Sequence, residues 1–179
     1  MPQNEATFRP QNRKFWRKFG LDAHILDIDP MKQQIIEAVR QVIAERMANA
    51  QTAMQAAQES ANSETKSSAG DKYETGRAMG QLDRNMYAQQ YEQARQEMVI
   101  VARLADNPTL PPPVVVVGAL VKTTGGVYWL AVSIGKITID NQDVMVVSPQ
   151  TPVGKLLLDK KVGDLVKLMS GSVTIEAIS

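Results

Sequence analysis

The stretch Gly70-Asp71-Lys72-Tyr73-Glu74 stands between two long segments that both carry the apolar spacing of a coiled coil. Before it, apolar or small residues recur three or four apart, with Arg46 interrupting the series: Ile36, Val39, Ile43, Ala50, Ala53 and Ala57. After it, the same alternation continues in Tyr87, Tyr91, Ala94, Met98, Val101 and Ala105. The two seams can face each other, so we predict an antiparallel coiled-coil hairpin over residues 31–105.

The connection between the two arms is predicted at residues 60–70, which are rich in Ser, Asn, Thr and Gly and have no periodicity. Arms of about 30 residues, rising 1.5 Å each, make a rod of roughly 45 Å. Asp71 and Glu74 then lie in an acidic tip, near residues 60–76, far from the rest of the chain. The many alanines toward the turn predict that the rod is thin there.

The C-terminal third of the chain changes to the spacing of β-strands. A Pro-rich linker at residues 106–113 ends the second helix and separates the two regions. We expect strands in five β-branched runs, at residues 114–121, 127–134, 137–147, 165–169 and 173–178. Thr151-Pro152 predicts the start of a short helix through Leu158. The fold class is therefore α + β, a helical hairpin followed by a small, mostly antiparallel sheet domain with one helix.

Composition excludes several kinds of site. The chain has no cysteine and a single histidine, His24, so thiolate zinc sites, cysteine nucleophiles and multi-histidine metal sites are excluded. No apolar run is long enough for a membrane span and no secretory signal is visible, so we expect a cytoplasmic protein with no membrane partner. The net charge of +1 gives no general argument for nucleic acid.

The first 30 residues carry a basic and aromatic cluster, Arg13-Lys14-Phe15-Trp16-Arg17-Lys18-Phe19. Such a pattern suits nucleic acid or an anionic membrane surface. A tail without function, or an upstream start site before Met31, explains it as well. We expect residues 1–30 to be a tail.

Two strings resemble the bacterial Gre transcript cleavage factors. Gly70-Asp71-Lys72-Tyr73-Glu74 is similar to the Gly-Asp-x-x-Glu of that family. The second string runs from Val147 to Val166, as Val147-Ser148-Pro149-Gln150-Thr151-Pro152-Val153-Gly154-Lys155 and, further on, Lys161-Val162-Gly163-Asp164-Leu165-Val166. It resembles the family's Ser-Pro, short helix and Lys-x-Val-Gly-Asp-x-Val signature.

The resemblance implies an FKBP-like C-terminal domain that docks on RNA polymerase, and a coiled coil that enters the secondary channel of that enzyme. Ser148, Pro149, Gly163 and Asp164 would then belong to the partner-binding surface. The tip acids would reach the active centre, close to nascent RNA, and stimulate cleavage of backtracked RNA. The protein would act as a monomer, without enzymatic activity or a cofactor of its own.

The tip acids have two compatible interpretations. Asp71 and Glu74 have the spacing of a helix cap, and the helix dipole also stabilises negative charge at this end of a helix. Residues three apart on a helix also lie about 5 to 6 Å apart at Cβ, so both carboxylates can approach one cation. Mg²⁺ takes six oxygens, so two carboxylates hold it weakly, and the remaining ligands would come from the polymerase. We therefore expect a shared Mg²⁺ that Asp71 and Glu74 help to hold only within the complex.

Other functions stay open at this point. Residues 75–79 depart from the Asn-Ala-Glu-Tyr that usually follows in the family, which allows a channel regulator that does not stimulate cleavage. A prolyl isomerase would need an aromatic-lined pocket, and Tyr128 and Trp129 are adjacent and so are expected on opposite faces of a strand. A coiled-coil adaptor would explain the rod and leave the acidic tip unexplained.

Overall fold

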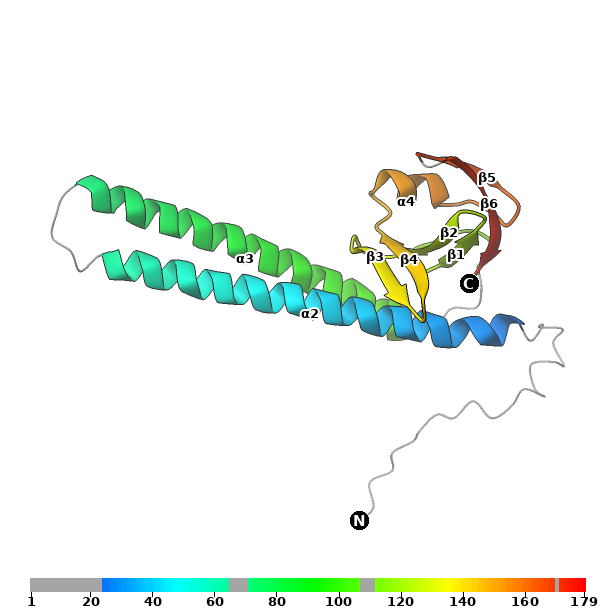
Figure 1. Ribbon diagram of the computed structural model, residues 1–179, viewed down its shortest axis with the longest axis horizontal. Helices are drawn as coiled ribbons and strands as arrows, with labels where there is room; N and C mark the ends of the chain where they lie inside the picture. The colour runs from blue at the N-terminus through cyan, green and yellow to red at the C-terminus, as the bar shows by residue number, and fades with distance from the viewer. Residues whose placement is uncertain (1–23, 65–70, 107–111, 170) are drawn as a thin grey trace, which may run out of the picture.

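The computed structural model describes residues 24–64, 71–106, 112–169 and 171–179 (Figure 1). Within these ranges, the side chains of residues 24–30, 63–64, 71–75 and 77 lie outside the description. Two long antiparallel helices project from a small sheet domain, which packs beside one end of the pair. No helix in the described ranges is long and apolar enough to cross a membrane.

The hairpin consists of α2 (His24–Glu64) and α3 (Asp71–Asp106). The two predicted seams face each other: Ile36, Val39 and Ile43 are buried on α2, and Ala94 and Val101 on α3. Large β-branched side chains fill the seam near the sheet domain, whereas small residues fill it toward the tip. The predicted hairpin is therefore confirmed, and α3 ends at Asp106, the first residue of the predicted Pro-rich linker.

The bounds of α2 differ from the expected ones at both ends. The helix begins at His24, inside the stretch 1–30 that was expected to be a tail, and it continues to Glu64, into the predicted turn. Ala61, in this extra segment, is buried, and a Cβ built on Gly80 of α3 would lie 3.0 Å from the Ala61 Cβ. Tertiary packing against α3 thus overrides the low helix propensity of the serines and asparagine nearby.

The sheet has six strands in the order β3-β4-β2-β1-β6-β5. Their bounds are β1 Leu120–Thr123, β2 Gly126–Leu130, β3 Gly135–Ile139, β4 Gln142–Val147, β5 Leu165–Leu168 and β6 Gly171–Ile178. Neighbouring strands are antiparallel except β2 and β4, which are parallel and paired from Val127↔Val144 to Leu130↔Val147. The sheet is therefore mostly antiparallel, as expected, with one parallel pair.

All five predicted strands have bounds that differ from the expected ones, and the largest differences are in the first three. Gly118 has φ +93°, so the first strand begins at Leu120 and not at Val114. Asp140 (φ 48°) and Asn141 (φ 62°) form a tight turn that divides the run 137–147 into β3 and β4. β2 ends at Leu130, before the expected residue 134.

Both faces of the sheet are covered at β2, which explains why this strand is continuously apolar. Val127 and Trp129 of β2 belong to the core that the sheet shares with the hairpin, together with Ile35, Val39 and Ile43. Tyr128 and Leu130 point to the other face, into a core with Leu157 of the short helix. The hairpin base, the sheet and the short helix therefore form three layers, and β2 is buried between the outer two.

The short helix α4 (Pro152–Leu157) begins as predicted. The Thr151 hydroxyl accepts a hydrogen bond from the Gly154 N–H at 3.1 Å, and proline follows at the first helical position. The helix ends at Leu157, one residue before the expected end, and Leu158 is its C-cap. Gly154 is buried against the turn before the helix, where a Cβ would overlap the Ser148 carbonyl oxygen.

We expect Gly154→Ala to destabilise the protein by about 3 kcal/mol, although alanine normally favours a helix, because its methyl group has no space. Gly163→Ala is the matched control: a Cβ there meets nothing within 4 Å, but φ is +92°, so we expect a loss of about 1 kcal/mol. Urea unfolding measures both free energies. Equal losses would show that the contact with Ser148 does not restrict residue 154.

A surface pair on α3 generates a prediction about pH. The Arg95 guanidinium donates two hydrogen bonds of 2.8 Å to the Glu92 carboxylate, and these, with a weaker one from Gln96, lower the pKa of Glu92 from 4.5 to about 2. Because the pKa is lowered in the folded protein, the pair stabilises it above pH 4.5, and this contribution is lost as the pH falls from 4.5 to about 2.

Arg95→Gln should therefore move the pKa of Glu92 back toward 4.5, which carboxyl-detected NMR titration measures directly. Arg84→Gln removes the same charge from an exposed position of the same helix and should leave the Glu92 pKa near 2. A Glu92 pKa that is the same in both variants would contradict the assigned cause.

Candidate functional site

The predicted acidic tip lies at the end of the hairpin that is farthest from the sheet domain (Figure 1). α3 begins at Asp71, so Asp71 and Glu74 both occupy its first turn, three positions apart. Their side chains, with those of Lys72, Tyr73 and Arg77, lie outside the description. The chain thus carries both positions to the tip, and the roles of capping and of cation binding both stay predictions.

Just behind the tip, the two helices approach each other closely. A Cβ at Gly80 would lie 3.0 Å from the Ala61 Cβ and 3.4 Å from the Ala57 carbonyl oxygen. Glycine and alanine at these positions keep the two backbones near each other, as the alanine-rich sequence predicts. The distal hairpin is therefore narrow.

Large apolar side chains on the distal half of α3 face away from α2. Met79, Leu82 and Met86 are 54%, 61% and 44% exposed, and their spacing of three and four residues places them along one side of the helix. We call these three residues the distal stripe. A row of exposed large apolar side chains is typical of a surface that contacts another molecule. The sequence carried this signal as a second three-and-four spacing beside the seam.

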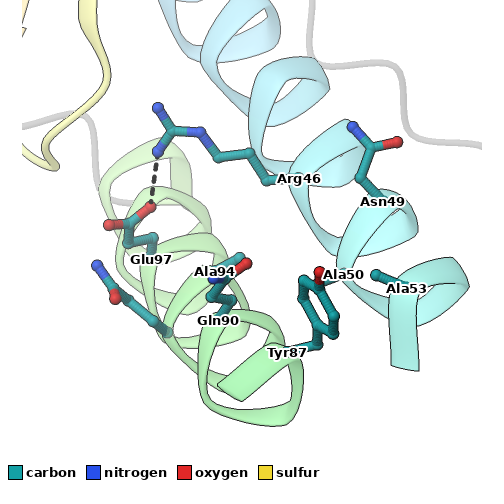
Figure 2. Close-up of a pocket in the computed structure, with 9 residues that line it drawn as sticks. Arg46, Asn49, Ala50, Ala53, Tyr87, Gln90, Ala94 and Glu97 are labelled. Carbon is teal, nitrogen blue, oxygen red and sulfur yellow. Dashed lines mark ion pairs between the residues drawn. The ribbon is translucent and has the colours of Figure 1, made fainter. Parts of the chain in front are cut away.

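A groove of about 460 Å³ opens between the arms at mid-length (Figure 2). Alanines of both seams form its apolar part, and polar side chains and Tyr87 surround them: Arg46, Asn49, Ala50, Ala53, Tyr87, Gln90, Gln93, Ala94 and Glu97. The groove exists because small seam residues stand beside the bulky Tyr87. In the sequence, Arg46 interrupts the apolar spacing of the seam, and that spacing does not predict this groove.

Arg46 connects three parts of the molecule at one end of this groove. Its Nη1 lies 3.5 Å from Glu97 Oε2 on α3 and donates at 3.4 Å to the carbonyl oxygen of Ser133, in the loop after β2. Figure 2 shows the Arg46 side chain reaching across to Glu97. The pair is partly exposed, so it contributes on the order of 1 kcal/mol or less. Through these two contacts, Arg46 of α2 links the hairpin to the sheet domain.

The structure offers no metal site among the side chains that it describes. Within that part of the chain, no group of three or more His, Cys, Asp or Glu residues is close enough to hold an ion. In the groove, the Glu97 carboxylate already faces the Arg46 guanidinium. The shared Mg²⁺ expected at Asp71 and Glu74 stays a prediction, because their side chains lie outside the description.

The four residues predicted to bind a partner shape the turns around α4 and β5. The Ser148 carbonyl oxygen accepts hydrogen bonds from the Thr151 N–H (3.0 Å) and hydroxyl (2.7 Å), and Pro149 follows in the same turn. Gly163 has φ +92° and donates to the Ile175 carbonyl at 2.8 Å. The Asp164 carboxylate accepts from the Lys161 N–H at 2.8 Å. Local structure thus explains these residue types, and their contact with a partner stays a prediction.

The two aromatic residues of the sheet lie on opposite faces of β2, as expected. Trp129 is fully buried in the core beneath the hairpin, where its Nε1 donates to the Gly118 carbonyl at 3.3 Å. Tyr128 is buried in the core on the α4 side. They do not line a common pocket, which removes the basis for a prolyl isomerase site built on this pair.

Comparison with solved structures gives a loose structural similarity. No family model matches the chain, and no curated protein matches it. The chain is similar to the crystal structure of GreA factor homolog 1 (Gfh1) of Thermus thermophilus, with a TM-score of 0.30 and 16% sequence identity. The match covers 78% of this chain and 94% of that chain.

Proposed function

We propose that the protein is a Gre-like transcription elongation factor. In this proposal it binds RNA polymerase through its C-terminal domain and inserts the hairpin into the secondary channel. The tip acids there help the polymerase to cleave backtracked RNA, and the protein has no catalytic activity alone. The observation that carries the proposal is the position of Asp71 and Glu74, in the first turn of α3 at the far end of the hairpin.

The dimensions of the hairpin support delivery of the tip into another molecule. The 36 residues of α3 extend about 54 Å at 1.5 Å per residue, and the close approach at Gly80 keeps the distal part narrow. The base of the hairpin is anchored in the core that it shares with the sheet. A rigid, narrow arm on an anchored base is suited to entering a channel.

The distal stripe supports contact between the inserted arm and protein walls. Met79, Leu82 and Met86 lie on the part of α3 that would be inside the channel, and they remain exposed in the free protein. Burying large apolar side chains of this kind contributes roughly 1.5 to 3 kcal/mol each. The stripe would thus provide affinity for the inserted position, separately from any role of the tip acids.

The chemistry proposed for the tip requires only the two carboxylates. Carboxylate oxygens are preferred ligands of Mg²⁺, and two of them three positions apart on a helix can approach one ion. In two-metal phosphodiester cleavage, the second ion activates the attacking water and stabilises developing charge. Asp71 and Glu74 would complete the coordination of that ion and orient it, and the polymerase would supply the remaining ligands.

A second candidate function keeps the same binding mode without cleavage. α3 contains Gly76 two residues after Glu74, and glycine inside a helix destabilises it by about 1 kcal/mol relative to alanine. A less rigid first turn would hold the carboxylates less firmly. The protein would then occupy the channel and inhibit or modulate the polymerase.

The two candidates differ in one assay, in which the purified protein is added to stalled, backtracked elongation complexes with Mg²⁺ and RNA shortening is followed. We expect the protein to accelerate cleavage, and the double variant Asp71→Asn, Glu74→Gln to lose about ten-fold or more of that acceleration while still binding. Asp83→Asn, an exposed carboxylate farther along α3, is the matched control and should retain the activity. Unchanged cleavage by the double variant would refute the role of the tip acids, and inhibition by the wild type would favour the second candidate.

Contact through the distal stripe is tested by binding. We expect Met79→Ser combined with Leu82→Ser to weaken binding to RNA polymerase by about ten-fold, because two apolar side chains are no longer buried. Val99→Ser combined with Ile100→Ser removes two exposed apolar side chains of α3 near its base and should change binding little. Circular dichroism checks that both double variants remain helical. Equal affinities of the two would contradict insertion of the distal arm.

A further inference from the structure

The two edges of the sheet are unequally protected. Strand order places β3 at one edge and β5 at the other. β3 lies against α2, and its outer face carries Lys136 and Thr138, which bind the Asp143 carboxylate at 3.0 and 2.7 Å. In the described part of the chain, β5 is paired on one side only, with β6. An open edge strand is a template for pairing with another chain.

The side chains of β5 alternate strictly between the core and solvent. Val166 and Leu168 are buried with Leu157 beneath α4. Leu165 is 68% exposed, Lys167 is exposed, and Met169, just after the strand, is fully exposed. Residues two apart in a strand share a face, so Leu165, Lys167 and Met169 form one outer row, with a cation between two apolar side chains.

The backbone of the same residues also points outward. The Asp164 carbonyl accepts a hydrogen bond of 3.0 Å from the Ile175 N–H of β6, which places Asp164 among the positions bonded to β6. Along an antiparallel ladder, bonded and non-bonded positions alternate. The N–H and C=O groups of Leu165 and Lys167 are therefore directed away from β6, toward the open edge.

We propose that the β5 edge binds an extended segment of a partner protein, which adds a strand to the sheet. The partner segment carries an acidic residue with an apolar residue two positions away on each side. Its backbone pairs with Leu165 and Lys167, its acidic side chain lies opposite Lys167, and its apolar side chains contact Leu165 and Met169. Main-chain pairing with side chains selected at alternate positions is an established mode of peptide recognition. This site is separate from the hairpin and does not depend on the function proposed for it.

The charge of Lys167 determines which kind of segment can pair with the β5 edge. In a pair of identical chains, the antiparallel register that matches Leu165 with Met169 places Lys167 opposite Lys167, and like charges directly opposite are destabilising. The N-terminal cluster from Arg13 to Phe19 has four basic residues and no acidic one, so it offers no counter-charge either. An acidic segment of another protein meets the charge requirement.

The test uses two capped seven-residue peptides. Both have isoleucine at positions 2 and 6 and threonine at positions 1, 3, 5 and 7, and they differ at position 4, which is glutamate in one and lysine in the other. In NMR titrations of the full chain, the glutamate peptide should bind about five-fold more tightly than the lysine peptide. On binding, amide hydrogen exchange should slow at Leu165 and Lys167, whose N–H groups point to the edge. The N–H groups of Val166 and Leu168 point toward β6, so their exchange rates should change little.

Charge reversal makes the test specific. Lys167→Glu should invert the preference, so that the lysine peptide binds more tightly. Lys155→Glu makes the same change of net charge on α4, and this variant should still bind the glutamate peptide more tightly than the lysine peptide. Leu165→Pro removes an outward N–H without breaking the β5–β6 ladder and should abolish binding. The proposal would be overturned if neither peptide bound, or if Lys167→Glu kept the original preference. It would also be overturned if the protein sedimented as a dimer that Leu165→Pro dissociates.

Discussion

The apolar core between the base of the hairpin and the sheet is the contact on which the rest of the molecule depends. Ile35, Val39 and Ile43 of α2 are fully buried there with Trp129 and Val144 of the sheet. Burial of each such side chain contributes roughly 1.5 to 3 kcal/mol. This core makes the hairpin one layer of the sheet domain, so the direction of the arm is fixed by packing. Everything proposed for the tip relies on that anchored base.

The hairpin changes in character along its length, and the change separates stability from function. Near the sheet, the residues of the seam are large and buried. At mid-length, alanines leave a groove beside Tyr87, which the Arg46–Glu97 pair borders. Toward the tip, Gly80 lets the helices approach closely, while the distal stripe turns apolar side chains outward. The distal half contributes little to the core, and its exposed surface is available for a partner.

In the sheet domain, the residues that carry the family resemblance also have structural roles. Ser148 accepts the hydrogen bonds that begin α4, Gly154 fits where any Cβ would overlap that turn, and Gly163 adopts a left-handed conformation before β5. Local folding therefore explains these residue types without any partner. β5 begins inside the string that carries the resemblance, at Leu165, and its open edge is distinguished by geometry and by the charge of Lys167.

Local spacing, capping and periodicity are enough to predict the hairpin, its two seams, the start of α4 at Thr151 and the location of the acidic tip. The tertiary structure sets where α2 ends, since Ala61 is helical where it packs against Gly80. It also decided the parallel pairing of β2 with β4, the contacts of Arg46 and the exposure of β5. These features depend on residues distant in sequence, and no local pattern specifies which distant surfaces meet.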